Sequence, residues 1–276
     1  MIGRNGSGKT VLFKCICGFL RVDDGAVLVD GKQIGKEIEA PESIGAIIET
    51  PGFLPGYSAR QNLQFLAGIR RKIGKKEIDE AIRKVGLDPE AKKHVGKYSL
   101  GMRQRLGIAQ TIMEEPSLLI LDEPMTGLDP NQLEEIRHLI KETGKKKTVL
   151  LSTHIMQEVE AICDRVIIIN QGKIVADRPI GEICTHADEG MVLRVEFSPG
   201  SDTHWLSKSE LFTHTSQQAP NCWRLTSPQG KDPREALFFE AAVRRCPIIA
   251  LHTEVYQLED IFHRYTQNFP AKPGKD

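Results

Sequence analysis

The sequence GRNGSGKT at residues 3–10 decides how the chain is interpreted, because it fits the pattern G-x-x-x-x-G-K-S/T of a phosphate-binding loop. Glycines let such a loop curl until successive backbone N–H groups converge on an anion, and the helix predicted for residues 11–19 adds its positive end. In this pattern Lys9 neutralises the β- and γ-phosphates and Thr10 holds Mg²⁺ through its hydroxyl. A glycine-rich turn that matches by chance is the alternative. The predicted phosphate-binding residues are Gly3, Asn5, Gly6, Ser7, Gly8, Lys9 and Thr10.

A second motif, LLILDE, occupies residues 118–123. Its apolar run predicts a buried strand, and a buried strand that ends in carboxylates directs them to the edge of the sheet where ligands bind in α/β folds. There Asp122 would hold the Mg²⁺ shell, and Glu123 would polarise the attacking water. The alternative is a strand that simply emerges into solvent with charged residues. The phosphate loop upstream makes that alternative a minor one.

Strand and helix patterns alternate along most of the chain, which predicts an α/β fold with a largely parallel sheet. The composition shifts near residues 184–190, and beyond it the pattern changes to a small α+β unit. We therefore expect a main domain at residues 1–185, a small accessory domain at 190–267 and a frayed tail at 268–276. Within the main domain, helical patterns predict a helical subdomain at about residues 55–115. The predicted strands are 26–29, 32–34, 44–48, 118–121, 148–152, 166–170, 173–176, 192–197, 222–226 and 248–252, and the predicted helices are 11–19, 59–69, 76–85, 101–113, 131–142, 156–162 and 233–245.

Three further motifs follow in order: YSLGMRQR at residues 98–105, GLD at 127–129 and STH at 152–154. The first resembles the ABC signature, usually written LSGGQ, and the other two resemble the D-loop and the switch histidine of ABC ATPases. With the phosphate loop and the LLILDE strand, they identify the chain as similar to that family from residue 3 to about residue 173. The resemblance implies a P-loop NTPase fold of the ABC ATPase type, with ATP and Mg²⁺ as its ligands.

The family resemblance also assigns roles to residues outside the phosphate loop. It implies that Ser99 and Gly101 contact the γ-phosphate bound by a partner chain, and that His154 contacts the γ-phosphate in its own site. It places Asp129, in the D-loop, among the nucleotide-binding residues. Ser99 taken alone is more often a helix N-cap, a role compatible with anion binding at the helix start. A lone His154 after a strand is usually structural or exposed.

The sequence departs from the family pattern within two motifs. Leu100 and Met102 replace the first glycine and the glutamine of the signature, whereas the serine and the second glycine remain. After the strand at 44–48, Glu49 stands where most ABC ATPases carry glutamine. The segment at 44–62 resembles ATPases that protect bacteria against bacitracin and lantibiotic peptides, in which glutamate is usual here. We interpret Glu49 as a variant that still binds Mg²⁺ or orients water.

The sequence begins at the phosphate loop, whereas the resembled family has several tens of residues before it. Those residues form the strand that leads into the loop and an aromatic platform for adenine. We therefore expect Met1 to be an internal methionine or a miscalled start, with the loop starting from an unanchored terminus. Ordering that loop at binding would weaken nucleotide affinity.

Composition excludes several classes of function. Lys plus Arg and Asp plus Glu are 37 each, so the formal net charge is zero and nothing favours nucleic-acid binding. No apolar run is long enough to span a bilayer, and the start lacks the features of a secretory signal. The 6 cysteines form no CxxC pair, which argues against a zinc site.

The segment YQLEDIF at residues 256–262 resembles the ending common in ATPases of ABC-2-type exporters. An amphipathic helix with Leu258, Ile261, Phe262 and Tyr265 packed inward is the alternative that carries no function. The resemblance implies the ATP-hydrolysing subunit of an exporter, with a second chain as partner in a homodimer. A separate ABC permease would hold both chains at the cytoplasmic face of the cell membrane.

The loop at 49–57 is the predicted docking segment for the permease. Its prolines and glycines favour a loop, and Phe53, Leu54 and Tyr57 are unusual in a loop with no partner. A local mini-core is the alternative. Two competing functions also remain: a soluble ABC protein acting on ribosomes or DNA, which the single ATPase domain and short inter-motif distance disfavour, and a non-catalytic or decayed ATP-binding fragment.

Overall fold

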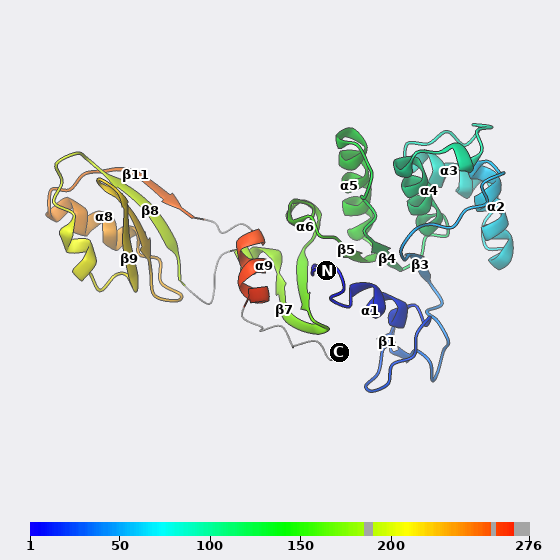
Figure 1. Cartoon of the computed structure of the whole chain (residues 1–276), viewed down its shortest axis with the longest axis horizontal. Helices are drawn as coiled ribbons and strands as arrows, with labels where there is room; N and C mark the ends of the chain where they lie inside the picture. The colour runs from blue at the N-terminus through cyan, green and yellow to red at the C-terminus, as the bar shows by residue number, and fades with distance from the viewer. Residues whose placement is uncertain (185–189, 255–257, 268–276) are drawn as a thin grey trace, which may run out of the picture. The chain divides into compact units, whose positions relative to one another are not determined.

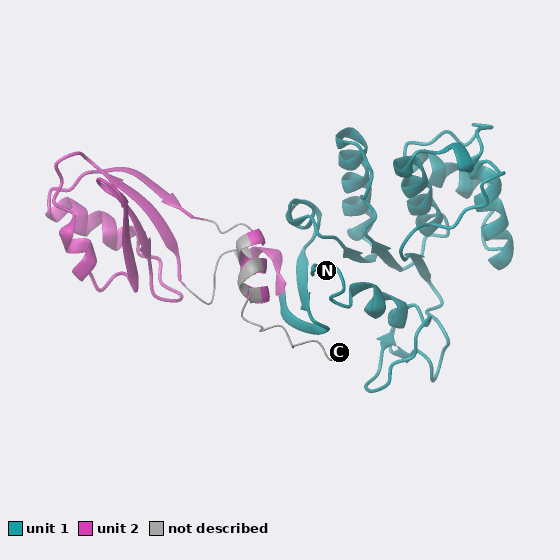
Figure 2. Ribbon diagram, viewed as in Figure 1, with its two compact units in different colours: residues 1–177 teal, residues 178–276 magenta. Residues whose placement is uncertain are grey.

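The computed structural model describes residues 1–184, 190–254 and 258–267, and it divides into two units, residues 1–177 and 178–276 (Figure 2). The division falls at Asp177, ahead of residue 185 in the sequence analysis, because α7 (Ile180–Cys184) packs against α9 (Leu258–Gln267) within the second unit. The tail at 268–276, expected to be frayed, and Tyr256 and Gln257 of the C-terminal motif lie outside the described residues.

A parallel sheet forms the centre of the first unit (Figure 1). β3 (Ile44–Ile47), β4 (Leu118–Asp122) and β5 (Thr148–Ser152) pair in the order β3-β4-β5. β4 is buried along its whole length, as its unbroken apolar run predicts. Asp122 lies opposite Ser152 at the carboxyl edge, so the acid that ends β4 and the serine that ends β5 emerge side by side.

Met1 and Ile2 extend this sheet beyond β5. Ile2 is fully buried and forms a parallel bridge with Ile168 of β6 (Arg165–Asn170), with N–H···O distances of 2.9 and 2.8 Å. On the other side, the carbonyl of Met1 accepts from the N–H of Thr153 at 3.2 Å. The phosphate loop therefore starts from a backbone that is hydrogen-bonded on both sides. The expectation of an unanchored start was wrong, because two residues suffice to bridge β5 and β6.

Helices cover both faces of the sheet (Figure 1). Side chains alternate along β4, so Ile120 packs with α1 (Lys9–Ile16) on one face while Leu121 joins α4 (Leu100–Ile112) and α5 (Pro130–Gly144) on the other. Two separate apolar clusters result, and they fix both sides of the strand that carries the acids. α6 (Met156–Ile162) follows β5 and contacts α5.

The helical subdomain lies within the predicted range of 55–115 and contains α2 (Ala59–Arg70), α3 (Lys75–Lys84), the 3₁₀ turn η1 (Val95–Lys97) and α4. Ser58 starts α2 with a capping box, because its hydroxyl accepts from the N–H of Gln61 while the Gln61 side chain accepts from the Ser58 N–H. α3 packs against α2 and α4, and all three contribute to the cluster that contacts the sheet.

Two short hairpins complete the first unit. β1 (Leu28–Val29) and β2 (Lys32–Gln33) pair antiparallel around Asp30 and Gly31, whose φ angles of 50° and 78° give the left-handed turn that such hairpins favour. β6 and β7 (Lys173–Pro179) form the second hairpin. The sequence patterns predicted both hairpins.

The second unit contains a four-stranded antiparallel sheet in the order β11-β8-β10-β9, with α8 (Arg234–Val243) packed on it. Three of these strands match the predicted ones: β8 (Val192–Phe197), β10 (Cys222–Thr226) and β11 (Ile248–Thr253). β9 (His214–Ala219) was not predicted. β9 escaped prediction because it is a polar edge strand without alternating apolar residues. α9 buries Leu258, Ile261 and Phe262, and the 3₁₀ turn η2 (His204–Lys208) lies beside β9.

Candidate active site

The phosphate loop closes around the amine of Lys9. Lys9 Nζ donates to the carbonyl oxygens of Gly3 at 2.7 Å and of Arg4 at 3.3 Å, and the N–H of Ser7 donates to the Arg4 carbonyl at 3.0 Å. Residue 3 must be glycine, since an added Cβ would lie 2.4 Å from Ser7 Oγ and 2.5 Å from a backbone oxygen of β6. Within the described part of the chain, the buried Ser7 hydroxyl has no hydrogen-bond partner. An unpaired buried donor beside this loop fits an anionic ligand.

Thr10 and Asp122 meet at the carboxyl edge of the sheet. Thr10 Oγ1 donates to Asp122 Oδ2 at 2.7 Å, and Ser152 Oγ donates to the other carboxylate oxygen, Oδ1. Asp122 is buried, so both of its oxygens are held by hydroxyl groups from neighbouring elements. The hydroxyl and carboxylate predicted to hold Mg²⁺ therefore lie side by side, and both are hard oxygen donors of the kind that Mg²⁺ takes. Among the described residues, no cluster of three His, Cys, Asp or Glu side chains could hold a metal unaided.

Glu123 stands in a left-handed backbone conformation, with φ of 49°, immediately after β4. Its N–H donates to the Ser152 carbonyl at 3.2 Å, and its own carbonyl accepts from Gln104 Nε2 at 3.1 Å. Its carboxylate Oε2 lies 2.8 Å from Nδ1 of His154. A non-glycine residue in this conformation persists only where its surroundings hold it, and such residues concentrate at functional sites.

A cavity of about 340 Å³ lies at this edge of the sheet, within the size range of small-molecule sites. Five of the predicted site residues line it: Asn5, Glu49, Asp122, Glu123 and His154. Gln104, Thr50, Thr126 and Leu100 line it as well. The structure thus brings residues from five separate sequence motifs to one cavity.

Glu49 also has a left-handed backbone, with φ of 62°, two residues after the end of β3. Its side chain is 63% exposed, and its carboxylate pairs with Lys14 Nζ of α1 at 2.6 Å. The residue predicted to bind Mg²⁺ or orient water is therefore on the cavity wall and bound to a lysine.

Glu158 holds the segment around His154 through a hydrogen bond to the preceding residue, Thr153. Thr153 Oγ1 donates to Glu158 Oε2 at 2.6 Å and accepts from the N–H of Ile155 at 3.1 Å. Glu158 is buried, and burial raises its pKa above the ordinary value, although the Thr153 hydroxyl acts in the opposite direction. The two residues that flank His154 are thus fixed, while His154 itself is 60% exposed in its side chain.

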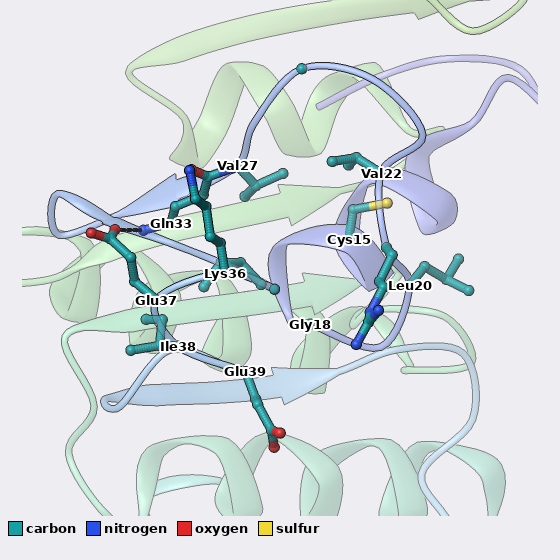
Figure 3. A pocket seen from close by; sticks show the side chains of 14 residues that line it. Cys15, Gly18, Leu20, Val22, Val27, Gln33, Lys36, Glu37, Ile38 and Glu39 are labelled. Atoms are coloured by element: carbon teal, nitrogen blue, oxygen red, sulfur yellow. Dashed lines mark hydrogen bonds between the residues drawn. The ribbon is translucent and has the colours of Figure 1, made fainter.

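A second cavity, of about 510 Å³, lies beside the β1–β2 hairpin (Figure 3). Cys15 and Gly18 from the end of α1 line one side, and Gln33 to Glu39 line the other. Glu37 accepts from the N–H of Gln33 at 2.6 Å across a turn of this lining. None of the predicted site residues lines this cavity. The larger cavity is therefore not the candidate active site. The smaller cavity is, because residues from several sequence motifs line it.

Comparison with known proteins agrees with the geometry. The family model described as ABC transporter matches residues 1–126. The linearmycin resistance ATP-binding protein LnrL of Bacillus subtilis (strain 168) is 30% identical over 277 residues, which covers 96% of this chain and 88% of LnrL. The chain belongs to the ATP-binding proteins of ABC transporters.

Two other relatives of this ABC chain are more similar over a shorter stretch. The ABC transporter ATP-binding protein YdbJ of Bacillus subtilis (strain 168) is 47% identical over 180 residues, covering 64% of this chain and 58% of YdbJ. The bacitracin transport ATP-binding protein BcrA of Bacillus licheniformis is 42% identical over 185 residues, covering 66% of this chain and 60% of BcrA. The chain therefore matches less than two thirds of the length of these two relatives.

Solved structures show the same fold. A dimeric, post-hydrolysis structure of the ATP-binding cassette MJ0796 bound to ADP and Pi has a TM-score of 0.58 at 21% identity, covering 65% of this chain and 83% of that chain. An ATP-binding subunit of an ABC transporter also has a TM-score of 0.58, at 28% identity, covering 66% and 78%. The predicted P-loop NTPase fold of the ABC ATPase type is confirmed.

In this ABC chain the signature segment packs against the D-loop. Ser99 is exposed and N-caps α4, since its hydroxyl accepts from the N–H of Met102 at 3.2 Å. Gly101 is buried, and an added Cβ would lie 2.8 Å from the Gly127 carbonyl. Leu100 lies against Gly127, where a Cβ would be 2.5 Å from its methyl group. The departure from the family at Leu100 is therefore accommodated by a glycine that leaves room for it.

Three residues of the site were not assigned roles from the sequence. Gln104 bonds the carbonyl of Glu123, Ser152 bonds Asp122, and Lys14 pairs with Glu49. Gln104 gave a usable signal, because it is a polar residue on the buried side of the predicted helix at 101–113. Asp129, assigned to the nucleotide site, also N-caps α5 by accepting from the N–H of Gln132 at 3.0 Å.

Proposed function

We propose that this chain hydrolyses ATP and thereby drives export through a separate membrane permease. The observation that carries the proposal is the contact between Glu123 Oε2 and His154 Nδ1 at 2.8 Å. Glu123 is the residue after Asp122, which binds Thr10. Glu123 is the general base, whose carboxylate takes a proton from the attacking water. His154 holds that carboxylate in the cavity and contacts the γ-phosphate. The intact network does not favour a non-catalytic or decayed fragment.

Lys9 supplies the positive charge of the phosphate site. Its amine donates hydrogen bonds to the carbonyls of Gly3 and Arg4, which keep the loop curled before nucleotide arrives. The β- and γ-phosphates of a bound nucleotide offer stronger, charge-assisted partners to the same amine. The N–H groups of the loop and the start of α1 complete the phosphate cradle, which contains Gly3, Asn5, Gly6, Ser7 and Gly8.

Thr10 and Asp122 would hold Mg²⁺, and Glu49 lines the same cavity as Asp122. The ion would neutralise the charge that develops on the transferring phosphoryl group. Mg²⁺ is commonly held by one or two protein oxygens together with phosphate oxygens and water, which agrees with this small donor set. Glu49 Oε1 is paired with Lys14, so the ammonium group competes with the ion for this carboxylate.

A complete catalytic site needs a second copy of the chain. Ser99 is exposed at the start of α4 and Gly101 follows in its first turn, and the N-terminal end of this helix can receive the γ-phosphate of a partner chain. Asp129 follows in the adjacent D-loop. Two chains would thus enclose two ATP molecules, each between the phosphate loop of one chain and the signature of the other.

The permease would dock on an apolar patch of the helical subdomain, which we call the docking surface: Leu54, Tyr57, Phe65 and Ile69. These side chains are 43–78% exposed, and the rings of Tyr57 and Phe65 contact edge to face at 5.0 Å. Phe53 is partly buried and packs against the main core, so it is not part of this surface. Among the described residues, no helix is both long and apolar enough to cross a bilayer. In this proposal, the docking surface attaches the chain to the permease at the cytoplasmic face of the membrane.

The proposal also includes the direction of transport and the class of substrate. The C-terminal segment at 256–262 resembles ABC-2-type exporters. Relatives that carry the names bacitracin transport and linearmycin resistance ATP-binding protein point to export of peptide antibiotics or drugs.

Two experiments test this function. Purified chain should hydrolyse ATP only with Mg²⁺, and Lys9→Ala should lose both binding and hydrolysis. Mixing Lys9→Ala chains with Ser99→Arg chains should leave at most one working site per mixed dimer. Absence of Mg²⁺-dependent hydrolysis by the unaltered chain in complex with its permease would refute the ATPase, and full activity from a demonstrated monomer would refute the shared site.

Docking is tested by crosslinking in a background whose native cysteines are replaced by serine. Tyr57→Cys should crosslink to a co-expressed permease, whereas Ile174→Cys, at another exposed apolar residue on β7, should not. Crosslinks at position 174 alone would move the docking surface.

A further inference from the structure

Gln104 connects the signature helix to the general base. It lies on α4, is 5% exposed, and its amide Nε2 donates to the backbone carbonyl of Glu123 at 3.1 Å. One helical turn earlier on the same helix, Leu100 packs against Gly127. Helix α4 thus contacts the segment after β4 at two points, one at the base itself and one at the D-loop.

The hydrogen bond from Gln104 stabilises the backbone of Glu123, which has an unfavourable conformation. Glu123 has a left-handed backbone, a conformation that a non-glycine residue keeps only where other contacts hold it. On one side, the Glu123 N–H is held by the carbonyl and hydroxyl of Ser152, at 3.2 and 3.1 Å. On the other side, the Glu123 carbonyl accepts from Gln104 Nε2 at 3.1 Å and from the backbone N–H of Thr126 at 3.3 Å, so Gln104 supplies its side-chain donor from α4. β5 and α4 therefore fix the two ends of this residue, and only α4 belongs to the helical subdomain.

We propose that Gln104 is a positioning residue that makes the orientation of Glu123 follow the position of the signature helix. The inference rests on the proposed function, in which Glu123 is the base and Ser99 engages nucleotide on a partner chain. Ser99 caps the same helix that carries Gln104. When Ser99 binds nucleotide on a partner chain, the position of the helix is fixed, and with it the position of the Gln104 amide. Hydrolysis is then efficient only when α4 is seated, which ties base alignment to closure of the dimer.

A pair of matched substitutions tests the role. Gln104→Met keeps the length of the side chain and removes the donor, and Gln110→Met makes the same change on the same helix. Gln110 is half-buried, and its side chain makes no hydrogen bond within the described ranges. We expect Gln104→Met to lower kcat about tenfold, the scale of one buried hydrogen bond, with KM for ATP unchanged. Gln110→Met should retain both constants.

A double-mutant cycle separates positioning from a general structural effect. If Gln104 acts through Glu123, Gln104→Met should have no further effect on the residual hydrolysis of Glu123→Gln. Hydrogen exchange of the peptide at residues 122–126 should accelerate in Gln104→Met and not in Gln110→Met, because the Glu123 carbonyl loses its side-chain donor and keeps only the N–H of Thr126.

The outcomes distinguish this inference from the proposed function. Unchanged kcat and unchanged exchange in Gln104→Met, together with loss of hydrolysis in Glu123→Gln, would overturn the positioning role alone. A tenfold loss that persists in the Glu123→Gln background, or an equal loss in Gln110→Met, would also overturn it. Full hydrolysis by Glu123→Gln would instead overturn the assignment of the base.

Discussion

Two glutamates end adjacent parallel strands in this protein, and their surroundings differ sharply. Glu49 follows β3 and Glu123 follows β4, and both have left-handed backbones, with φ of 62° and 49°. Glu123 is held through its N–H, its carbonyl and its carboxylate, by Ser152, Gln104 and His154. Glu49 is held through its carboxylate by the lysine of an exposed ion pair. The same residue type at the same edge of one sheet is therefore fixed in one case and adjustable in the other.

We propose that the two glutamates have different roles, Glu123 as a fixed general base and Glu49 as a movable contact to Mg²⁺. A general base must sit within hydrogen-bond reach of its proton, so it benefits from a backbone fixed in advance. A residue that contacts Mg²⁺ only when nucleotide is present must be able to move, and an exposed ion pair is easily broken because it contributes only about 0–1 kcal/mol.

The largest effect is expected at Asp122, the carboxylate that ends β4 and is predicted to hold Mg²⁺. Asp122→Asn keeps the shape of the side chain but removes its charge, which weakens Mg²⁺ binding beside Thr10. We expect ATP hydrolysis at limiting Mg²⁺ to fall by at least about 100-fold, since even residues behind a metal ligand cost roughly 10–100-fold when changed. A Mg²⁺ titration of the rate measures this. An unchanged half-saturating Mg²⁺ concentration would remove Asp122 from the metal site.

Glu49→Gln should have a much smaller effect. The change restores the residue that most of the resembled family carries and retains an oxygen that can bind Mg²⁺ or orient water. We expect the rate of hydrolysis to change by less than about fivefold, the scale of the exposed ion pair that is lost. Steady-state ATP hydrolysis at saturating Mg²⁺ decides it. A loss comparable to that of Asp122→Asn would mean that Glu49 contributes to the metal site as strongly as Asp122 does.

Lys14→Met sharpens the same comparison from the opposite side. Removing the lysine frees Glu49 without altering it, so Mg²⁺ no longer competes with an ammonium group. The half-saturating Mg²⁺ concentration should fall by up to about fivefold, and the effect should shrink in 0.5–1 M salt as surface charges are screened. Lys14→Met combined with Glu49→Gln is the control, in which the benefit should vanish. A benefit that persists there would show that Lys14 acts elsewhere.

The smallest effect concerns Glu158, which supports the segment of His154. Its pKa is raised by burial, so above its ordinary value of 4.5 the folded chain binds more protons than the unfolded chain. The free energy of unfolding therefore falls as pH rises through the raised pKa. Glu158→Gln keeps an acceptor for Thr153 and does not titrate. Its stability relative to the unaltered chain should grow as pH rises above 4.5 and then level off, as measured by urea unfolding across pH. A pH-independent difference would contradict this.

Much of the fold and of the site could be predicted from local sequence patterns. The loop at residues 3–10, the strand ending at Asp122 and the histidine at 154 are short motifs whose chemistry follows from their own residues, and the structure brings them to one place. The hairpin at Asp30–Gly31 was equally local, since its turn needs left-handed residues.

Contacts between distant elements could not be predicted in this way. The bonds of Gln104 to Glu123 and of Lys14 to Glu49 join residues from different helices and strands, and they depend on how those elements pack. β9 was missed because an exposed edge strand needs no apolar alternation. The anchoring of Ile2 was missed because a two-residue segment has no periodicity, although its burial between β5 and β6 is complete.

The most direct test of the central claim is the fate of ATP bound to Glu123→Gln, followed in a single turnover with Glu49→Gln measured alongside. If Glu123 is the fixed general base, the Glu123→Gln chain should bind ATP with unchanged affinity, accumulate as a dimer that retains uncleaved nucleotide, and hydrolyse it roughly 10²–10⁴-fold more slowly. The Glu49→Gln chain should cleave its ATP at close to the normal rate. Normal cleavage by Glu123→Gln, with retention of ATP by Glu49→Gln, would reverse the roles of the two glutamates and contradict the account.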